Sequence, residues 1–526
     1  MRRFSQMAVA AAGLLAALPS TASADFDYGV TAGEITSSSA IVWTRADRSG
    51  RVVAHLSADR RFGDADDRRR TLRARGSDDN TVQTRFTRLR PGHVYRYRFT
   101  QGRDRSATGR FETAPRASRA QTINFGISGD ADAQPAPGQT TPFWNNFEVY
   151  GAMATERNDF NINLGDTIYS DTEVGAAQGT TPPPALTTAE KWGKYKQNLA
   201  LSNLQRVRRA TGLYNHWDDH EFINDFSMAE NGADVYRSGV EAFRDYSPVR
   251  YSSNLGIYRR IRWGRNLELF FLDQRSFRSA KADDQCINPQ TGQPDLAPTA
   301  PQRHRNAFAL LVPSLSEPVS QQCKDTINSP DRTFLGSAQV QRFVRDVQRS
   351  TATFKVVVNE MPVQQLYALP YDRWEGYAYE REQLLRTLST RVANVVLLTT
   401  DIHANLIGDV RYRTLEDPGP LDTGMDEFTT GPVATRSFEK QIDDVAGRPG
   451  SGDAVENLFL RPAPPDGVGM RCVADDVFSY ADVRVTRNSL TVTPKDGSGA
   501  LVRQENSQPC GPFTVTRASS PPNVTP

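Results

Sequence analysis

The chain has 526 residues, of which 38% are hydrophobic and 24% charged, and its 63 basic residues nearly balance its 61 acidic residues. This length exceeds what one hydrophobic core usually supports, so two or more domains are expected. The composition is that of a globular protein, and no stretch after the N-terminus is long and apolar enough to span a bilayer.

Residues 1–24 have the features of an export signal. Arg2 and Arg3 precede an apolar run from Met7 to Leu18, and Ala22-Ser23-Ala24 follows as a small-residue cleavage site. A buried N-terminal helix is the alternative. We expect a secreted, periplasmic or cell-surface protein. Both the twin-arginine and the general secretory routes stay open, because Arg2-Arg3-Phe4 lacks the spacer of strong twin-arginine signals.

Cleavage after Ala24 would remove Arg2 and Arg3 and leave equal numbers of basic and acidic residues. Proteins that bind nucleic acids generally carry a basic excess on one face, so no specific nucleic-acid binding is expected. The Arg-rich segment from Arg60 to Arg75 also contains acidic residues, which favours a solvated face with salt bridges.

Residues 25–115 are predicted to form a small β-sandwich. Short alternating runs lie between turn residues, at Ser39–Trp43, Val52–Leu56 and Tyr95–Phe99. The stretch from Leu89 to Tyr95 resembles the corner motif of fibronectin type III-like domains, in which a leucine and a tyrosine anchor a turn between two strands. This domain is therefore expected to be structural.

A different periodicity begins after a linker near residues 115–120 and indicates an α/β layered domain over residues 120–526. Helix-like segments such as Ala189–Leu204 and Tyr379–Leu388 separate strand-like runs, which are Ile123–Ile127, Phe160–Leu164, Leu267–Leu272, Phe354–Val358 and Val395–Leu398. From about residue 470 the chain is interpreted as a C-terminal extension of this domain.

A Pro- and Gln-rich stretch at about residues 281–335 is predicted to be a long insertion, either a lid over the active site or an inert surface loop. The chain's four cysteines lack the close spacing typical of zinc sites. In an exported protein disulfides are reasonable. We expect Cys286 to pair with Cys323 and Cys472 with Cys510, although other connectivities and free buried thiols remain alternatives.

Acidic and polar residues follow most of the strand-like runs. They are Asp130 and Asp132, Asp166 and Tyr169, Asn359 and Glu360, Asp401 and His403, and the block Trp217-Asp218-Asp219-His220-Glu221. Ligands of open α/β sheets collect at the carboxyl ends of strands, so these residues are expected to converge on one pocket.

Carboxylates gathered in one place repel each other unless cations lie between them. Two metal ions about 3.5–4 Å apart, sharing a bridging carboxylate, would offset this repulsion and generate a hydroxide near neutral pH. A single acidic strand end would indicate only a surface turn. Several of them in corresponding places predict a metal-dependent hydrolytic centre.

At these motifs the chain resembles the alkaline phosphatase D (PhoD-like) family of calcineurin-like metallophosphoesterases. The resemblance covers nearly the whole mature chain. It rests on the metal-binding blocks around Asp166 and Tyr169, Asp218–Glu221 and Asp401–His403, together with the N-terminal sandwich and the blocks Phe271–Arg275 and Asp372–Tyr377. It implies an α/β protein in which a fibronectin III-like β-sandwich precedes an α/β layered metallophosphoesterase domain.

The resemblance also implies roles for single residues. Asp166 matches the bridging carboxylate and Tyr169 the phenolate that binds ferric iron. Asp401 and His403 match the last ligand pair. The remaining metal-ligand candidates are Asp130, Asp218, Asp219 and Asn359. Family members can carry Cys at the position that matches Asp130. Fe³⁺ with Ca²⁺ is implied as the cofactor pair, and Zn²⁺ or Mn²⁺ are alternatives because an oxygen ligand at Asp130 can change the metal preference.

His220 matches the residue that steadies the scissile phosphate or the leaving group, and Arg275 is a candidate phosphate-binding group. A salt bridge from Arg275 to Asp273 is an equal alternative. His220, His403 and Tyr169 can also be read as ordinary buried side chains. His216 is interpreted as structural, and Asp372, Trp374 and Tyr377 as parts of the pocket wall.

The function expected from the sequence is hydrolysis of phosphate monoesters or diesters by in-line attack of a metal-activated hydroxide or bridging oxygen. The partner is then a phosphate ester substrate. The alternative is a cell-surface binding protein in which a calcium cluster only stabilises the second domain. A serine hydrolase is disfavoured because the chain has no Gly-x-Ser-x-Gly motif.

Overall fold

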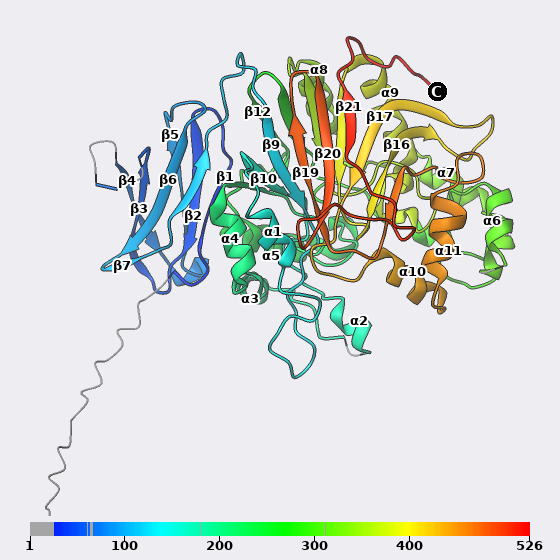
Figure 1. Cartoon of the computed structure of the whole chain (residues 1–526). Helices are drawn as coiled ribbons and strands as arrows, with labels where there is room; N and C mark the ends of the chain where they lie inside the picture. The colour runs from blue at the N-terminus through cyan, green and yellow to red at the C-terminus, as the bar shows by residue number, and fades with distance from the viewer. Residues whose placement is uncertain (1–25, 60–61, 64–66, 180, 311) are drawn as a thin grey trace, which may run out of the picture.

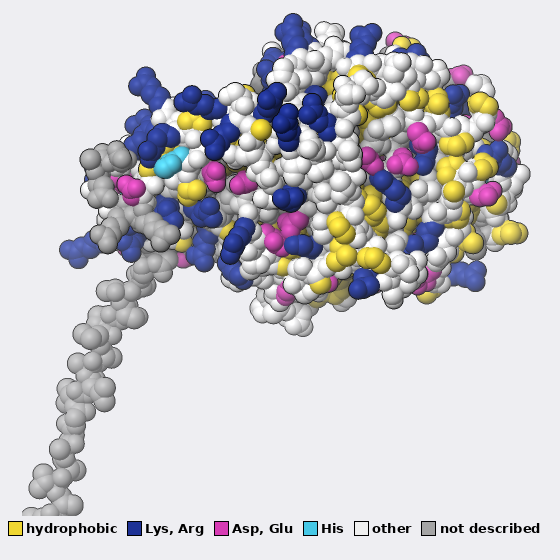
Figure 2. Space-filling view, turned by 45° about the horizontal axis from the view of Figure 1, so that its top comes forward, with side chains coloured by type: hydrophobic (Ala, Val, Ile, Leu, Met, Phe, Trp, Pro, Cys, Tyr) yellow, Lys and Arg dark blue, Asp and Glu magenta, His cyan; other side chains and the backbone are white. Residues whose placement is uncertain are grey.

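The computed structural model describes residues 26–526 except 60–61, 64–66, 180 and 311 (Figure 1). The predicted export signal lies outside the described residues. Among the helices that are described, none has the length and apolar character needed to cross a membrane. On the face shown in Figure 2, Lys and Arg side chains are spread over the N-terminal domain and the adjoining part of the second domain, with acidic side chains between them.

The N-terminal domain is an antiparallel β-sandwich, as the alternating runs predicted. One sheet contains β1 (Val30–Gly33), β2 (Ser39–Arg45) and β5 (Thr81–Thr87). The other contains β3 (Gly50–Ser57), β4 (Arg68–Ala74), β6 (Val94–Gln101), β7 (Asp104–Arg105) and β8 (Gly109–Glu112). The Tyr95 hydroxyl accepts a hydrogen bond from the Arg90 backbone N–H at 2.9 Å, which fixes the expected tyrosine corner.

The second domain contains two mixed sheets. The six-stranded sheet has the order β11 (Gly212–Asn215), β10 (Phe160–Asn163), β9 (Ile123–Ser128), β19 (Ser479–Val485), β20 (Ser489–Asp496) and β21 (Phe513–Thr516). The seven-stranded sheet has the order β12 (Arg259–Trp263), β13 (Leu267–Phe271), β14 (Phe354–Val358), β15 (Val395–Thr399), β17 (Leu421–Thr429), β16 (Asn405–Arg413) and β18 (Cys472–Ala474). The neighbouring strands β9, β10 and β11 are parallel, and so are β13, β14, β15 and β17.

The two sheets pack face to face, and helices cover their outer faces (Figure 1). Alternation along the strands sends Leu269 and Phe271 into the core between the sheets and Phe270 toward α8 (Ser337–Gln348) and α9 (Ala378–Arg391). The rings of Phe160 and Trp263 pack against each other between the sheets, with 4.4 Å between their centroids. The other outer face carries α1 (Glu148–Met153), α3 (Thr188–Leu199), α4 (Ser202–Ala210) and α5 (Met228–Tyr246).

The segment predicted as one helix over Ala189–Leu204 is two helices, α3 and α4. The chain is extended at Leu201, and the Gln205 side chain donates to the Leu199 carbonyl, which caps the end of α3. The break redirects the chain so that α4 packs against β1 and β8 of the sandwich. The prediction over Tyr379–Leu388 corresponds to α9.

The described residues of the insertion at 281–335 lie beside α10 (Phe438–Ala446) and α11 (Ser451–Val455). The insertion contains α6 (Gln302–Phe308), α7 (Gln321–Ile327) and the 3₁₀ turns η2 (Asp283–Gln285) and η3 (Pro313–Ser316). The expected disulfides Cys286–Cys323 and Cys472–Cys510 are both present. The other short elements are α2 (Val174–Gln178), η1 (Gly76–Asp78), η4 (Pro370–Asp372), η5 (Trp374–Tyr377) and the π-helical turn η6 (Glu456–Leu460).

The segment after residue 470, interpreted from the sequence as an extension, supplies strands to both sheets of the second domain. β19 pairs antiparallel with β9, so it lies in the middle of the six-stranded sheet. The sandwich is joined to this domain by a buried ion pair in which Arg259 Nε lies 2.6 Å from Glu34 Oε1. Arg259 also donates to the Asn215 carbonyl at the end of β11.

Candidate metal centre

Three strand ends meet at one edge of the two facing sheets. Asp130 follows β9, Asp166 follows β10 and His403 follows β15, and each of these residues offers a ligand atom within 4.8 Å of the others. The Tyr169 hydroxyl lies 3.0 Å from His403 Nε2. Parallel strands therefore deliver residues far apart in sequence to one buried place, as the sequence predicted.

The backbone at these residues is left-handed. The φ angles are 63° at Asp130, 50° at Asp166, 72° at Asp401 and 57° at His403. Residues other than glycine rarely adopt this conformation, and such strain gathers at functional sites because the surrounding fold must hold it. The sharp turns aim the side chains back across the ends of the sheets.

Two further sets of ligand atoms adjoin the set of Asp130, Asp166 and His403. One consists of Asp166, Asp219 and His220, and the other of Asp218, Asp219 and Asp401. Asp166 belongs to two of these sets, which is the arrangement expected of a bridging carboxylate. Gly165 permits this approach, because a Cβ there would lie 2.8 Å from Asp218 Cβ.

Asp225 and Asp372 form a further acidic set with Asp219. Neither Asp225 nor Asp372 was predicted from the sequence to be a metal ligand. Cations already pair with both residues. Lys281 Nζ lies 2.9 Å from Asp225, and Arg275 Nη1 lies 2.8 Å from Asp372. These pairs make Asp225 and Asp372 outer parts of the acidic cluster.

Arg275 is fully buried among carboxylates. Its Nε lies 2.5 Å from Asp218 Oδ1, and its Nη2 lies 3.5 Å from Asp219 Oδ1. The alternative salt bridge to Asp273 is wrong, because Asp273 accepts instead from the backbone N–H groups of Arg275 and Ile257. The planar guanidinium thus offsets several negative charges at once.

The charge of Arg275 does not fully stabilise the ionised forms of the carboxylates around it. Burial raises the pKa of Asp166, Asp218 and Asp401 well above the ordinary value, and repulsion from Asp219 adds to the effect at each. Asp218 Oδ2 and Asp219 Oδ1 accept no hydrogen bond within the described part of the chain. Buried oxygens of this kind need a cation, so the residues present fit a metal centre.

His403 is oriented from behind. Its Nδ1 lies 2.7 Å from the Arg436 carbonyl oxygen and 2.5 Å from the Gln441 side-chain nitrogen. These contacts hold the ring so that Nε2 faces the Tyr169 hydroxyl at 3.0 Å. A backbone carbonyl behind a histidine in this way is a common feature of metal-binding histidines.

His220 is held on two sides. Its Nδ1 lies 2.7 Å from Asp171 Oδ1, and its ring stacks on Tyr169 with 4.0 Å between centroids. Burial opposes its protonation, but the charges of Asp219, Asp171 and Asp166 outweigh burial and raise its pKa well above the ordinary value. Asp171 was not predicted from the sequence as a site residue. The one feature that could have indicated it is its position two residues after Tyr169, in the same block at the strand end.

Two residues from the strand ends have other contacts. The Asn359 side-chain oxygen accepts from Gln274 and, at 3.4 Å, from Trp374 Nε1. The buried His216 lies 3.0 Å from Glu360, and burial lowers its pKa to about 4. Among the described residues, neither His216 nor Glu360 is in a group of His, Cys, Asp and Glu side chains close enough to share a metal ion, and the structural interpretation of His216 stays a prediction.

The centre opens into a pocket of about 400 Å³. Its polar wall includes Asp166, Asp219, His220, Asp401 and His403, and its opposite wall is apolar. This volume is within the range of small-molecule sites, about 300–1,000 Å³. A substrate can therefore reach the acidic cluster.

Comparison with known proteins places the chain in a family. Residues 136–491 match the model of the PhoD-like phosphatase and residues 11–115 that of the PhoD-like phosphatase, N-terminal domain. Alkaline phosphatase D of Bacillus subtilis (strain 168) is 25% identical over 429 residues, which cover 74% of this chain and 66% of that protein, just under two thirds of its length.

Solved structures share the fold. A structure of PhoD matches with a TM-score of 0.71 at 20% sequence identity, and the matched region covers 95% of this chain and 90% of the PhoD chain. A purple acid phosphatase from yellow lupin has a TM-score of 0.53 at 10% identity, covering 94% and 74%. The first family model matches well over half of the sequence. The chain belongs to the PhoD-like phosphatase family.

Proposed function

We propose that the protein is an exported metal-dependent phosphoesterase that hydrolyses phosphate monoesters or diesters. The observation that carries the proposal is the buried set of Asp130, Asp166, Tyr169 and His403, which shares Asp166 with a second acidic group inside an accessible pocket. The family's phosphatase description and the similar alkaline phosphatase D support it. Two disulfides suit a protein that is secreted, periplasmic or at the cell surface.

The ligand types favour Fe³⁺ beside Ca²⁺. Tyr169 would bind iron as a phenolate together with Asp130, Asp166 and His403, and the all-oxygen group of Asp218, Asp219 and Asp401 suits calcium. Zn²⁺ or Mn²⁺ are alternatives with the same donors. When bound, such ions neutralise charge on the phosphoryl group and make water more acidic.

The remaining residues position the substrate and a proton. His220 directs Nδ1 to Asp171, which leaves Nε2 to donate a proton to the departing oxygen. Arg275 does not line the pocket, and its guanidinium is engaged by Asp218 and Asp372. We therefore assign Arg275 to orienting Asp218 and offsetting charge, in place of the phosphate-binding role expected from the sequence.

The function is tested by nitrophenol release from p-nitrophenyl phosphate and from bis(p-nitrophenyl) phosphate. A chelator is expected to abolish release, and added metal is expected to restore it. A folded protein that stays inactive on both esters with metals restored would support the alternative, a binding protein with a structural calcium site.

Substitutions at Asp166 and His220 are expected to separate metal binding from proton transfer. Asp166→Asn removes the shared carboxylate charge, so metal and activity should be lost together. His220→Ala should keep most of the metal, while turnover of an alkyl ester falls about 10²- to 10⁴-fold, the usual contribution of a positioned acid–base group. Metal content and turnover are measured on the same preparations.

The leaving group provides the control for His220. Nitrophenolate departs without protonation, so the defect of His220→Ala should shrink with nitrophenyl esters. Loss of metal from His220→Ala, or an equal defect with good and poor leaving groups, would contradict the assigned role.

Asp171 is expected to act through His220. Asp171→Ala should lower turnover of alkyl esters by about 10- to 100-fold, a usual cost of removing the partner that orients a functional histidine. Metal content should not change, and the defect should be absent in His220→Ala. Asp234→Ala, at an exposed aspartate that does not line the pocket, is the matched control. Additive losses in the double variant would rule out this coupling.

Tyr169 is expected to give the protein a visible charge-transfer band, because a phenolate bound to ferric iron absorbs in this range. Tyr169→Phe should remove the band. The absorption spectra of the two proteins are compared at equal iron content. A colourless wild type with full activity would exclude the ferric assignment.

A further inference from the structure

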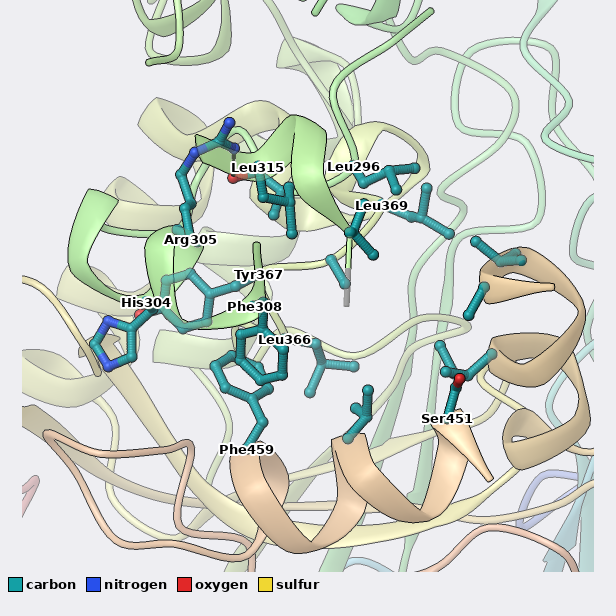
Figure 3. Close-up of a pocket in the computed structure, with 18 of the residues that line it drawn as sticks. Leu296, His304, Arg305, Phe308, Leu315, Leu366, Tyr367, Leu369, Ser451 and Phe459 are labelled. Atoms are coloured by element: carbon teal, nitrogen blue, oxygen red, sulfur yellow. Dashed lines mark hydrogen bonds between the residues drawn. The ribbon is translucent and has the colours of Figure 1, made fainter. Parts of the chain in front are cut away.

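A second pocket, of about 300 Å³, lies between the disulfide-closed insertion and the helices α10 and α11 (Figure 3). Its wall is predominantly apolar and includes Phe308 and Leu315 from the insertion, Leu366 from the loop after β14, and Phe459 from η6. Figure 3 shows these side chains converging on one space from different elements. We call this space the apolar pocket.

The apolar pocket adjoins the pocket of the acidic centre. Leu366, Leu369, Val445 and Phe459 are among the residues that line both. These shared residues place the apolar pocket beside the pocket that contains Asp166 and His220. Binding of a phosphate at the acidic centre does not by itself require an apolar wall of this kind.

Most polar groups around the apolar pocket are engaged elsewhere. The Arg305 guanidinium lies 2.6 and 2.8 Å from the two carboxylate oxygens of Asp295. The Tyr367 hydroxyl donates to Glu416 at 2.8 Å. Two buried nitrogens of the lining, His304 Nδ1 and Arg305 Nε, have no hydrogen-bond partner among the described residues. The wall is nonetheless mainly apolar, which favours an alkyl chain over a sugar or a second phosphate.

Apolar side chains shared by the two pockets are partly exposed to solvent. Leu369 is 42% and Val445 57% exposed, and each lines both pockets. Exposed apolar side chains that gather in one place mark a site that a ligand can cover. The insertion wall is held by Cys286–Cys323 and by the Arg305–Asp295 pair, so the pocket is formed before a ligand binds.

We propose that the apolar pocket binds an alkyl or acyl chain of the substrate, so that the enzyme acts on phosphodiesters carrying an apolar substituent. This inference rests on the proposed phosphoesterase function. In the reaction a water oxygen forms a new bond to phosphorus, the bond to the leaving oxygen breaks, and the leaving oxygen receives a proton. The apolar chain stays on the retained phosphate ester or leaves as the alcohol.

The test is a series of p-nitrophenyl alkyl phosphates with methyl, butyl and octyl chains, each kept below the concentration at which it aggregates. The same leaving group departs from every member, so the chain is the only variable. Each buried methylene is expected to raise kcat/KM by about fourfold until the pocket is filled. Alkylphosphonates should bind competitively, with a heat-capacity change that grows more negative with chain length.

Two alanines provide a matched pair of variants. Ala300 lines the apolar pocket only, whereas Ala307 lies on the exposed face of α6 and outside both pockets. Ala300→Trp should remove the chain-length dependence, and Ala307→Trp should behave as the wild type on every ester. Ala446→Asp, at an exposed position of the same wall, gives a second disruption that does not depend on packing a large ring.

The outcomes separate the two proposals. If no ester is hydrolysed with metals restored, the phosphoesterase function itself fails. If the methyl ester is hydrolysed but kcat/KM does not change with chain length, only the apolar-pocket proposal is overturned. It is also overturned if Ala300→Trp and Ala446→Asp keep the wild-type dependence.

Discussion

Carboxylates buried together must be neutralised, and the rest of this structure follows from that constraint. Asp130, Asp166, Asp218 and Asp219 are almost inaccessible to solvent, where an unpaired charge is costly. Arg275 offsets part of the charge from within the cluster. Metal ions, which the donor set fits, would supply the remainder. Two facing sheets are needed because one sheet alone would bring fewer strand ends to this place.

Parts of the chain remote from the chemistry hold the centre in place. The sandwich contributes Glu34, which fixes Arg259 and through it the end of β11, just before the block that contains Asp218 and His220. The loop before α10 contributes the Arg436 carbonyl, which contacts His403 Nδ1 and helps to orient the ring. The insertion adds the apolar wall beside the phosphate pocket. Each of these segments therefore either holds a residue of the acidic centre in position or forms part of a wall beside it.

Local patterns in the sequence predicted the strands, the sandwich and the acidic strand ends, because alternation and turn residues act over a few positions. They did not predict the break at Leu201, which depends on packing against the sandwich. The pairing of β19 with β9 joins segments more than 300 residues apart and leaves no local signal. Asp171 and the partners of Arg275 were missed for the same reason, since only the folded chain brings them together.

The most direct measurement is elemental analysis of protein purified without added metal, combined with activity on the same sample. The proposed metal pair predicts stoichiometric iron together with a different, divalent metal ion, and loss of activity in step with removal of either. A folded and fully active protein that contains neither iron nor any other metal would contradict this account.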